Sequence, residues 1–194
     1  TIVQGRRRCE KAIHALLTDT EQLPTGRLRQ LITEMREEWS DLDRRIGALD
    51  REFVELARTD EAARRLSTIP GIGALNATAL VAAVGDAATF RRSRDLGAWL
   101  GLVPRQNTTG GKPRLLGISK RGNKYLRTLL IHGARAALPS LAKSETTLGA
   151  WLRSLLARCH RNTVVVALAN KLARIAWVML RREETFSHDL LAAA

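Results

Sequence analysis

A seam of large apolar residues at heptad-like spacing constrains this chain more than any other feature. Successive members are three or four positions apart over residues 28–56. That spacing places them on one stripe of an α-helix, and at 1.5 Å per residue the stripe is roughly 42 Å long. Charged residues of both signs fill the positions between, so the pattern predicts a long coiled-coil helix, and one extra step of four marks a stutter. The seam residues are Leu28, Leu31, Met35, Trp39, Leu42, Ile46, Leu49, Phe53 and Leu56.

A narrow stripe of this length needs a partner helix. The partner could be a second copy of the chain, which would give a homo-oligomer (dimer or tetramer), or a helix from outside this sequence. A plain amphipathic helix packed on its own domain is the alternative, and the sequence leaves it open. Because the first residue is Thr1 rather than methionine, we expect the chain to be part of a longer product.

The segment after the seam favours a helix-hairpin-helix motif. Ile69-Pro70-Gly71-Ile72-Gly73 precedes an alanine-rich run. In such a motif, glycines let backbone N–H groups at the start of the second helix face a phosphate. Gly71 and Gly73 are therefore candidate nucleic-acid-binding residues. A tight turn between two helices, without any ligand, is the alternative.

The remaining pattern predicts a mainly α protein: a long coiled-coil helix, then a helical domain holding the hairpin motif and a basic loop or small β-hairpin. We expect a short helix at 6–17, and helices beginning with Ser93 as N-cap, near Asn123 and ended by Pro139, at 148–158, and after an Asn162 cap. The run 164–180 contains Lys171 and Arg174, which indicates a buried helix rather than a membrane span. The expected divisions are 1–66 (N-terminal helix and coiled coil), 67–182 (helical domain) and 183–194 (a frayed tail).

Positive charge is concentrated in residues 91–135. This stretch holds eleven basic side chains and one acidic one, and so carries +10 of the chain's formal +13. A local concentration of this kind indicates a binding face for a polyanion, usually nucleic acid, although a solvated basic loop is the ordinary alternative. Strand-like segments at 103–106 and 114–116 flank a Thr-Thr-Gly-Gly tip, which predicts either a small hairpin or a loop that orders on its ligand. The candidate nucleic-acid-binding residues here are Arg91, Arg92, Arg94, Arg105, Lys112, Arg114, Lys120, Arg121, Lys124 and Arg127.

Few catalytic arrangements fit the chain. The two cysteines are far apart and the four histidines are scattered, so no metal site or disulfide framework is indicated and a reducing compartment fits. Gln106 and Pro113 stand where a P-loop needs glycine and serine or threonine. The remaining candidates are the hydroxyls of Thr108, Thr109 and Ser119, yet no base or metal that would activate them is evident. From the residues alone, the sequence predicts nucleic-acid binding.

Several segments together resemble a known family. They are IPGIG at 69–73, LVAAVGD at 80–86, LGAWLGLVPRQ at 96–106, the TTGGK loop, ISKRGN at 118–123, LLIHGARA at 129–136 and VALANKLARIAW at 166–177. In this order they look like the C-terminal half of a DEDD-type "IS one-ten" insertion-sequence transposase, a relative of the Piv/MooV DNA invertases. The resemblance covers about residues 1–182.

The resemblance implies a coiled coil and a transposase domain, with an N-terminal RuvC-like domain and its Mg²⁺ site absent from this chain, which itself would hold no cofactor. It also implies a bacterial, cytoplasmic, nucleoid-associated recombinase that acts on donor and target DNA under a structured guide RNA (bridge or seeker RNA), without a membrane. The family carries a nucleophilic serine in the loop where this chain has threonines. Counting forward from GLVPR points to Thr109, and counting back from ISK points to Thr108. Ser119 is the third candidate, and a turn shaped by two non-catalytic threonines is the alternative.

Overall fold

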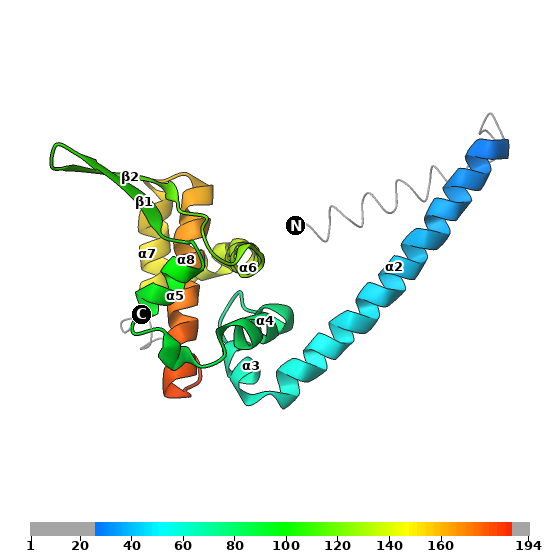
Figure 1. The fold of residues 1–194 in the computed structure, drawn as a ribbon, viewed down its shortest axis with the longest axis horizontal. Coiled ribbons are helices and arrows are strands. Elements are labelled where there is room, and N and C mark those ends of the chain that lie inside the picture. The colour runs from blue at the N-terminus through cyan, green and yellow to red at the C-terminus, as the bar shows by residue number, and fades with distance from the viewer. Residues whose placement is uncertain (1–25, 188–194) are drawn as a thin grey trace. The chain divides into compact units, whose positions relative to one another are not determined.

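The computed structural model describes residues 26–187, and the chain divides into two compact units, Thr1–Arg51 and Glu52–Ala194. The predicted helix at 6–17 and the end of the predicted frayed tail lie outside the described residues. The structure is mainly helical with one small sheet (Figure 1), which confirms the predicted fold class.

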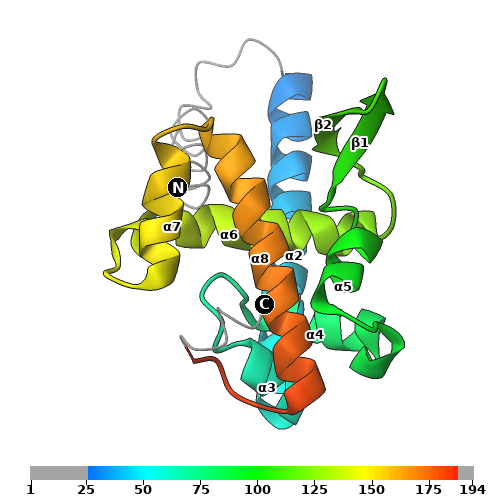
Figure 2. The same cartoon turned by 90° about the vertical axis from the view of Figure 1, so that its left-hand side faces the viewer.

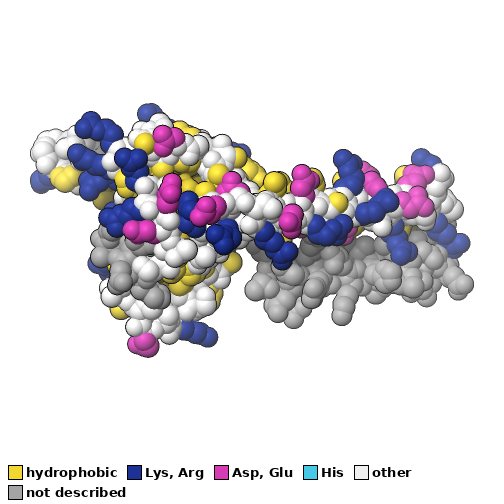
Figure 3. All heavy atoms as spheres, turned by 90° about the horizontal axis from the view of Figure 1, so that it is seen from below, with side chains coloured by type: hydrophobic (Ala, Val, Ile, Leu, Met, Phe, Trp, Pro, Cys, Tyr) yellow, Lys and Arg dark blue, Asp and Glu magenta, His cyan; other side chains and the backbone are white. Residues whose placement is uncertain are grey.

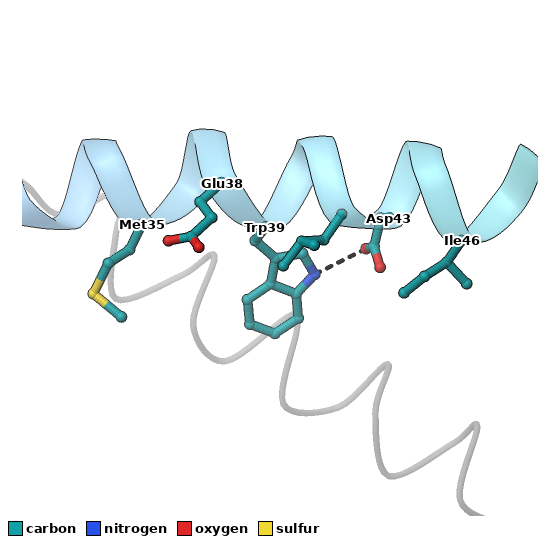
Figure 4. Close-up of a pocket in the computed structure, with 6 residues that line it drawn as sticks. Met35, Glu38, Trp39, Asp43 and Ile46 are labelled. Carbon is teal, nitrogen blue, oxygen red and sulfur yellow. Dashed lines mark hydrogen bonds between the residues drawn. The ribbon is translucent and has the colours of Figure 1, made fainter.

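The seam lies on one continuous helix, α2 (Gly26–Thr59). The seam side chains other than the half-buried Phe53 are exposed to solvent, Met35 by 68% and Leu49 by 52%, and Ala57 is the buried residue of this helix. Arg, Asp and Glu side chains are mixed along α2 (Figure 3). Met35, Trp39 and Ile46 project from the same side of α2 (Figure 4), and the indole N–H of Trp39 donates to the carboxylate of Asp43 at 2.8 Å. A solvent-exposed apolar stripe is what the coiled-coil interpretation requires; the helix that would pair with it stays a prediction.

The second unit packs short helices around α8 (Arg161–Arg182). The others are α3 (Glu61–Leu66), α4 (Ala74–Val84), the 3₁₀ turn η2 (Ala87–Thr89), α5 (Ser93–Trp99), α6 (Lys124–Lys143) and α7 (Thr147–Leu156). α8 contacts α3, η2, α5, α6 and α7, and in Figure 2 it crosses in front of α6. By length and apolar composition α8 could cross a membrane, but more than half of its most apolar window is buried in this unit. Its burial is that of a core helix, as predicted.

Two predicted helix caps are displaced. Arg92, not Ser93, is the N-cap of α5, because the carboxylate of Asp95 accepts the backbone N–H of Arg92 at 3.0 Å. His160, not Asn162, caps α8, since its ring Nδ1 accepts the backbone N–H of Asn162 at 3.2 Å. In α8 the cap side chain accepts a backbone N–H of the first turn, whereas in α5 the third helical residue accepts the N–H of the cap itself.

Pro139 does not end α6, contrary to prediction. The helix continues to Lys143 with Pro139 inside it. Proline removes one backbone hydrogen bond, but Leu138 and Leu141 are buried on either side of it. Burial of two leucine side chains is worth several kcal/mol, which offsets the missing bond and carries the helix one turn further.

The turn between α3 and α4 is packed tightly on α6. Ile69 and Ile72 are buried in the core. Gly71 has φ +93°, and a Cβ atom added there would lie 2.8 Å from the carbonyl oxygen of Gly133. A Cβ atom added at Gly133 would in turn collide with the carbonyl oxygen of Gly71. Glycine at both positions therefore lets the two backbones touch.

Candidate nucleic-acid interface

The basic stretch forms an exposed antiparallel hairpin of β1 (Pro104–Thr109) and β2 (Lys112–Ile118). This confirms the predicted hairpin, which is longer than the sequence indicated. Gly110 and Gly111 both have positive φ, +58° and +74°, and join the paired residues Thr109 and Lys112. Two residues with positive φ match the right-handed twist of the flanking strands, and this conformation favours glycine. The hairpin extends away from the helices of its unit (Figure 1).

The register gives the hairpin two unlike faces. Thr109 pairs with Lys112, and Asn107 pairs with Arg114. Paired residues, and residues two apart on one strand, project from the same face. All four are exposed, and we call Asn107, Thr109, Lys112 and Arg114 the basic face. Arg105 is exposed where the register is irregular, between Pro104 and Gln106.

The opposite face is uncharged. Gln106 pairs with Leu115, and Thr108 pairs with Pro113. The side-chain amide of Gln106 donates to the hydroxyl of Thr108 at 3.0 Å. The two threonines that sequence counting could not separate thus lie on different faces, and of the two only Thr109 shares its face with cations.

Close backbone contacts hold the base of the hairpin, and we call this region the junction. A Cβ atom added at Gly101 would collide with the carbonyl oxygen of Arg121, and one at Gly122 with the carbonyl oxygen of Trp99. Backbone N–H groups of Ser119 and Lys120 donate to the carbonyls of Val103 (2.8 Å) and Gly101 (3.1 Å). The segments entering and leaving the hairpin therefore touch backbone to backbone.

Arg127 belongs to this junction and not to the surface. It is 9% exposed, and its guanidinium donates to the carbonyl oxygens of Leu100 (2.9 Å) and Arg121 (3.4 Å). The sequence placed Arg127 among the candidate nucleic-acid-binding residues, but the structure buries its side chain. Lys124 and Arg127 lie one turn apart on α6, yet Lys124 is exposed and Arg127 points inward. Arg127 points inward because the chain before α6 packs over it and offers the carbonyl oxygens of Leu100 and Arg121 as acceptors.

The remaining candidates are distributed around the same unit. Lys120, Arg121 and Lys124 are exposed beside the hairpin base, and Ser119 is half-buried there. Arg91, Arg92 and Arg94 are exposed at the start of α5. Gly73 is exposed at the start of α4, whereas Gly71 faces α6. Figure 3 shows Lys and Arg side chains gathered at one end of the Glu52–Ala194 unit.

Among the described residues, no activating group for a hydroxyl nucleophile accompanies the hairpin. Within residues 26–187, no three His, Cys, Asp or Glu residues gather in a way that could hold a metal ion. The hydrogen bond to Thr108 comes from an amide, which cannot take up its proton at neutral pH. The described residues can bind and orient a phosphate, and could supply an attacking oxygen.

Sequence reasoning missed two basic residues of α8. Lys171 and Arg174 interrupt an apolar run, and in the sequence they served only to mark a buried helix. In the structure both are half-buried, and the Arg174 Nε donates to the hydroxyl of Ser93 at 3.4 Å, 81 residues away in sequence. No local signal could have joined them to the arginines that flank Ser93.

The chain is similar in sequence to known transposases. Residues 63–147 match the family described as Transposase IS116/IS110/IS902. A probable family 20 transposase from Pseudomonas aeruginosa is 46% identical over 185 residues, which cover 93% of this chain and 54% of that protein. The transposase for insertion sequence element IS1111A from Coxiella burnetii is 41% identical over 186 residues, 96% of this chain and 51% of that protein. The pilin gene-inverting protein of Moraxella bovis is 29% identical over 155 residues, 76% of this chain and 46% of that protein.

The chain spans about half the length of the curated relatives it matches. The matched family region, residues 63–147, runs from α3 through the hairpin to the start of α7. It therefore contains the basic face, the glycine contact on α6 and the buried Arg127. On these sequence matches, the chain belongs to the IS116/IS110/IS902 family of transposases.

Proposed function

We propose that this chain is the DNA-joining part of a transposase or recombinase, in which the basic face of the hairpin holds a DNA phosphate and Thr109 is the attacking hydroxyl. The observation that carries the proposal is the hairpin register, in which Thr109 shares one face with Lys112 and Arg114. Cations around a phosphate neutralise its charge and stabilise the charge that develops during attack. Thr108, on the uncharged face, is the less suitable nucleophile.

The step proposed is a transesterification. The hydroxyl oxygen of Thr109 attacks the phosphorus of a phosphodiester and forms a threonine–O–P bond. The P–O bond to one strand end breaks, and that end leaves as a hydroxyl, which carries a proton in place of the one that threonine lost. A strand-end hydroxyl can reverse the reaction on the covalent intermediate and so join two DNA strands without a high-energy cofactor.

The wider assembly is part of the same proposal. A structured guide RNA would select the donor and target DNA, and α2 would bring protomers together as a dimer or tetramer. Mg²⁺ would belong to a RuvC-like domain of the whole protein, and no step above depends on it. The relatives' printed names, transposases and a gene-inverting protein, support DNA rearrangement as the outcome.

A covalent adduct tests the nucleophile. The full-length protein is incubated with guide RNA and labelled target DNA, and protein–DNA species that survive denaturation are mapped by mass spectrometry. We expect the linkage at Thr109, with adduct formation lost in Thr109→Ala. Thr108→Ala is the matched control, because it removes the same hydroxyl from the neighbouring position on the uncharged face, and it should retain the adduct.

An adduct at Thr108 or Ser119 would overturn the assignment to Thr109 while keeping the reaction class. A wild-type protein that binds RNA and DNA tightly yet yields no adduct would favour the second candidate function, a non-catalytic nucleic-acid-binding module. That candidate rests on the absence of an activating base among the described residues near the hairpin.

The proposed oligomer is tested on α2. Replacing Leu42 and Ile46 by aspartate puts charges in the middle of the exposed seam, where a partner helix would have to bury them at a cost of several kcal/mol. We expect the mass measured by light scattering to fall to that of a monomer. Ala48→Asp, exposed but off the seam, should leave the mass unchanged, and an unchanged mass in the double variant would exclude the coiled coil.

A further inference from the structure

Two basic side chains of the core helix α8 lie next to each other. Lys171 and Arg174 are three positions apart, so they are neighbours on the helix surface. Both are half-buried. Burial, followed by the positive charge of Arg174, lowers the pKa of Lys171 below its ordinary value. A lowered pKa means that the folded protein disfavours the charged lysine, so this charge opposes folding near neutral pH.

The pair lies beside a second basic group from another part of the chain. Arg174 donates to the hydroxyl of Ser93, and α5 packs against α8 (Figure 2). Ser93 is flanked by Arg91, Arg92 and Arg94, which are all exposed. Asp95 is the nearest acidic residue in sequence, and its carboxylate accepts the backbone N–H of Arg92. No ion pair joins Arg174 to an acidic side chain within the described part of the chain.

We propose that Lys171 and Arg174 of α8, together with Arg91, Arg92 and Arg94 around Ser93, form a second phosphate-binding site for a nucleic-acid backbone. The proposal rests on the proposed nucleic-acid function. It adds a site at the N-terminal end of α5, whereas the hairpin follows the C-terminal end of this helix. A phosphate between these groups would accept hydrogen bonds from guanidinium and ammonium donors. It would also offset the repulsion between two cations that the free protein tolerates at a cost.

The position of the site suits a backbone that passes from the hairpin along the unit. α5 begins at Ser93 and ends at Trp99, shortly before β1. A nucleic acid held by the basic face at one end and by α8 at the other would be gripped at two separate phosphates. Two separate phosphate contacts fix the orientation of a strand, whereas a single contact leaves the strand free to rotate about it.

Salt titration of binding separates this site from general charge. The intact chain is titrated with a DNA duplex and, in parallel, an RNA hairpin, and log affinity is plotted against log salt. We compare Lys171→Gln/Arg174→Gln with Arg181→Gln/Arg182→Gln, which removes the same charge from exposed positions in the last turn of α8. Each lost phosphate contact reduces the slope by about 0.9. Because the site holds one phosphate, the first variant should lose about 0.9 from the slope, and the second should match wild type.

Further measurements test whether the substitutions act through folding rather than through binding. Lys171→Arg/Arg174→Lys keeps both charges and should keep the wild-type slope. The Lys171→Gln/Arg174→Gln variant should still unfold in one cooperative transition, and the nucleic acid should raise its unfolding temperature less than it raises that of wild type. If the pair had a merely structural role, the variant would lose stability while the nucleic acid stabilised it as much as wild type.

The outcomes are distinct. Equal slopes for the two neutralised variants, or a wild-type slope in Lys171→Gln/Arg174→Gln, overturns the second site and leaves the proposed function standing. If the slope measured for the wild-type chain is near zero, the chain makes no phosphate contacts, and the proposed nucleic-acid binding itself is overturned. A change in slope with only the duplex, or only the RNA hairpin, identifies which backbone occupies the site.

Discussion

Replacing Gly133 by alanine is expected to lower the free energy of unfolding of the Glu52–Ala194 unit by about 3 kcal/mol or more, at the upper end of what overpacking costs. The added methyl group would collide with the carbonyl oxygen of Gly71, and the side-chain amide of Asn76 lies 3.3 Å from the same point. Neither neighbour can retreat cheaply, because Gly71 is held in a turn at φ +93° between buried Ile69 and Ile72. Chemical denaturation followed by circular dichroism measures the effect.

Gly73→Ser is the matched control for that substitution. Gly73 belongs to the same turn, has no atom within 4 Å of its Cβ position and is the N-cap of α4 at φ −87°. Serine is a favoured N-cap residue, so this variant should be as stable as wild type or more so. If Gly133→Ala lost no more stability than Gly73→Ser, the turn would not rest on α6 as the structure shows.

Arg127→Met should cost about 2–3 kcal/mol of stability, because it removes charge-assisted hydrogen bonds and leaves buried carbonyl oxygens unpaired. The carbonyls are those of Leu100 and Arg121, one on each side of the hairpin base. Methionine can occupy most of the space of the side chain without donating. Beyond the global loss, we expect amide hydrogen exchange to accelerate at Ser119 and Lys120, whose N–H groups donate across the same junction.

Arg135→Met separates this effect from loss of charge. Arg135 is exposed on the same helix, and its replacement should change stability by less than about 0.5 kcal/mol. Arg127→Lys should recover part of the loss, since an ammonium can reach one carbonyl but not both. Wild-type exchange rates at Ser119 and Lys120 in Arg127→Met would show that the guanidinium does not hold the hairpin base.

Local chemistry made several features predictable from sequence. The three-and-four spacing of apolar residues predicted α2, because helical periodicity is a property of the chain itself. The Gly-Gly tip between two strand-like segments predicted the hairpin, because positive φ at two successive residues favours glycine. The concentration of charge in residues 91–135 predicted an exposed basic surface, since charged side chains are rarely buried without partners.

Tertiary structure decided what depends on contacts distant in sequence. It turned Arg127 inward, because backbone carbonyls from Leu100 and Arg121 met there. It carried α6 past Pro139, because leucine burial outweighed one missing hydrogen bond. It also separated Thr108 from Thr109 onto opposite faces, since strand register fixes which side chains share a face.

The sequence by itself therefore determined the elements, the location of the charge and the pair of candidate hydroxyls. Only the folded chain decided which arginine is a structural anchor, which threonine lies among cations, and that Arg174 meets Ser93 across 81 residues. The physical reason is the same in each case. Propensity and periodicity act over a few residues, whereas burial and hydrogen-bond partners are set by whatever the fold brings alongside.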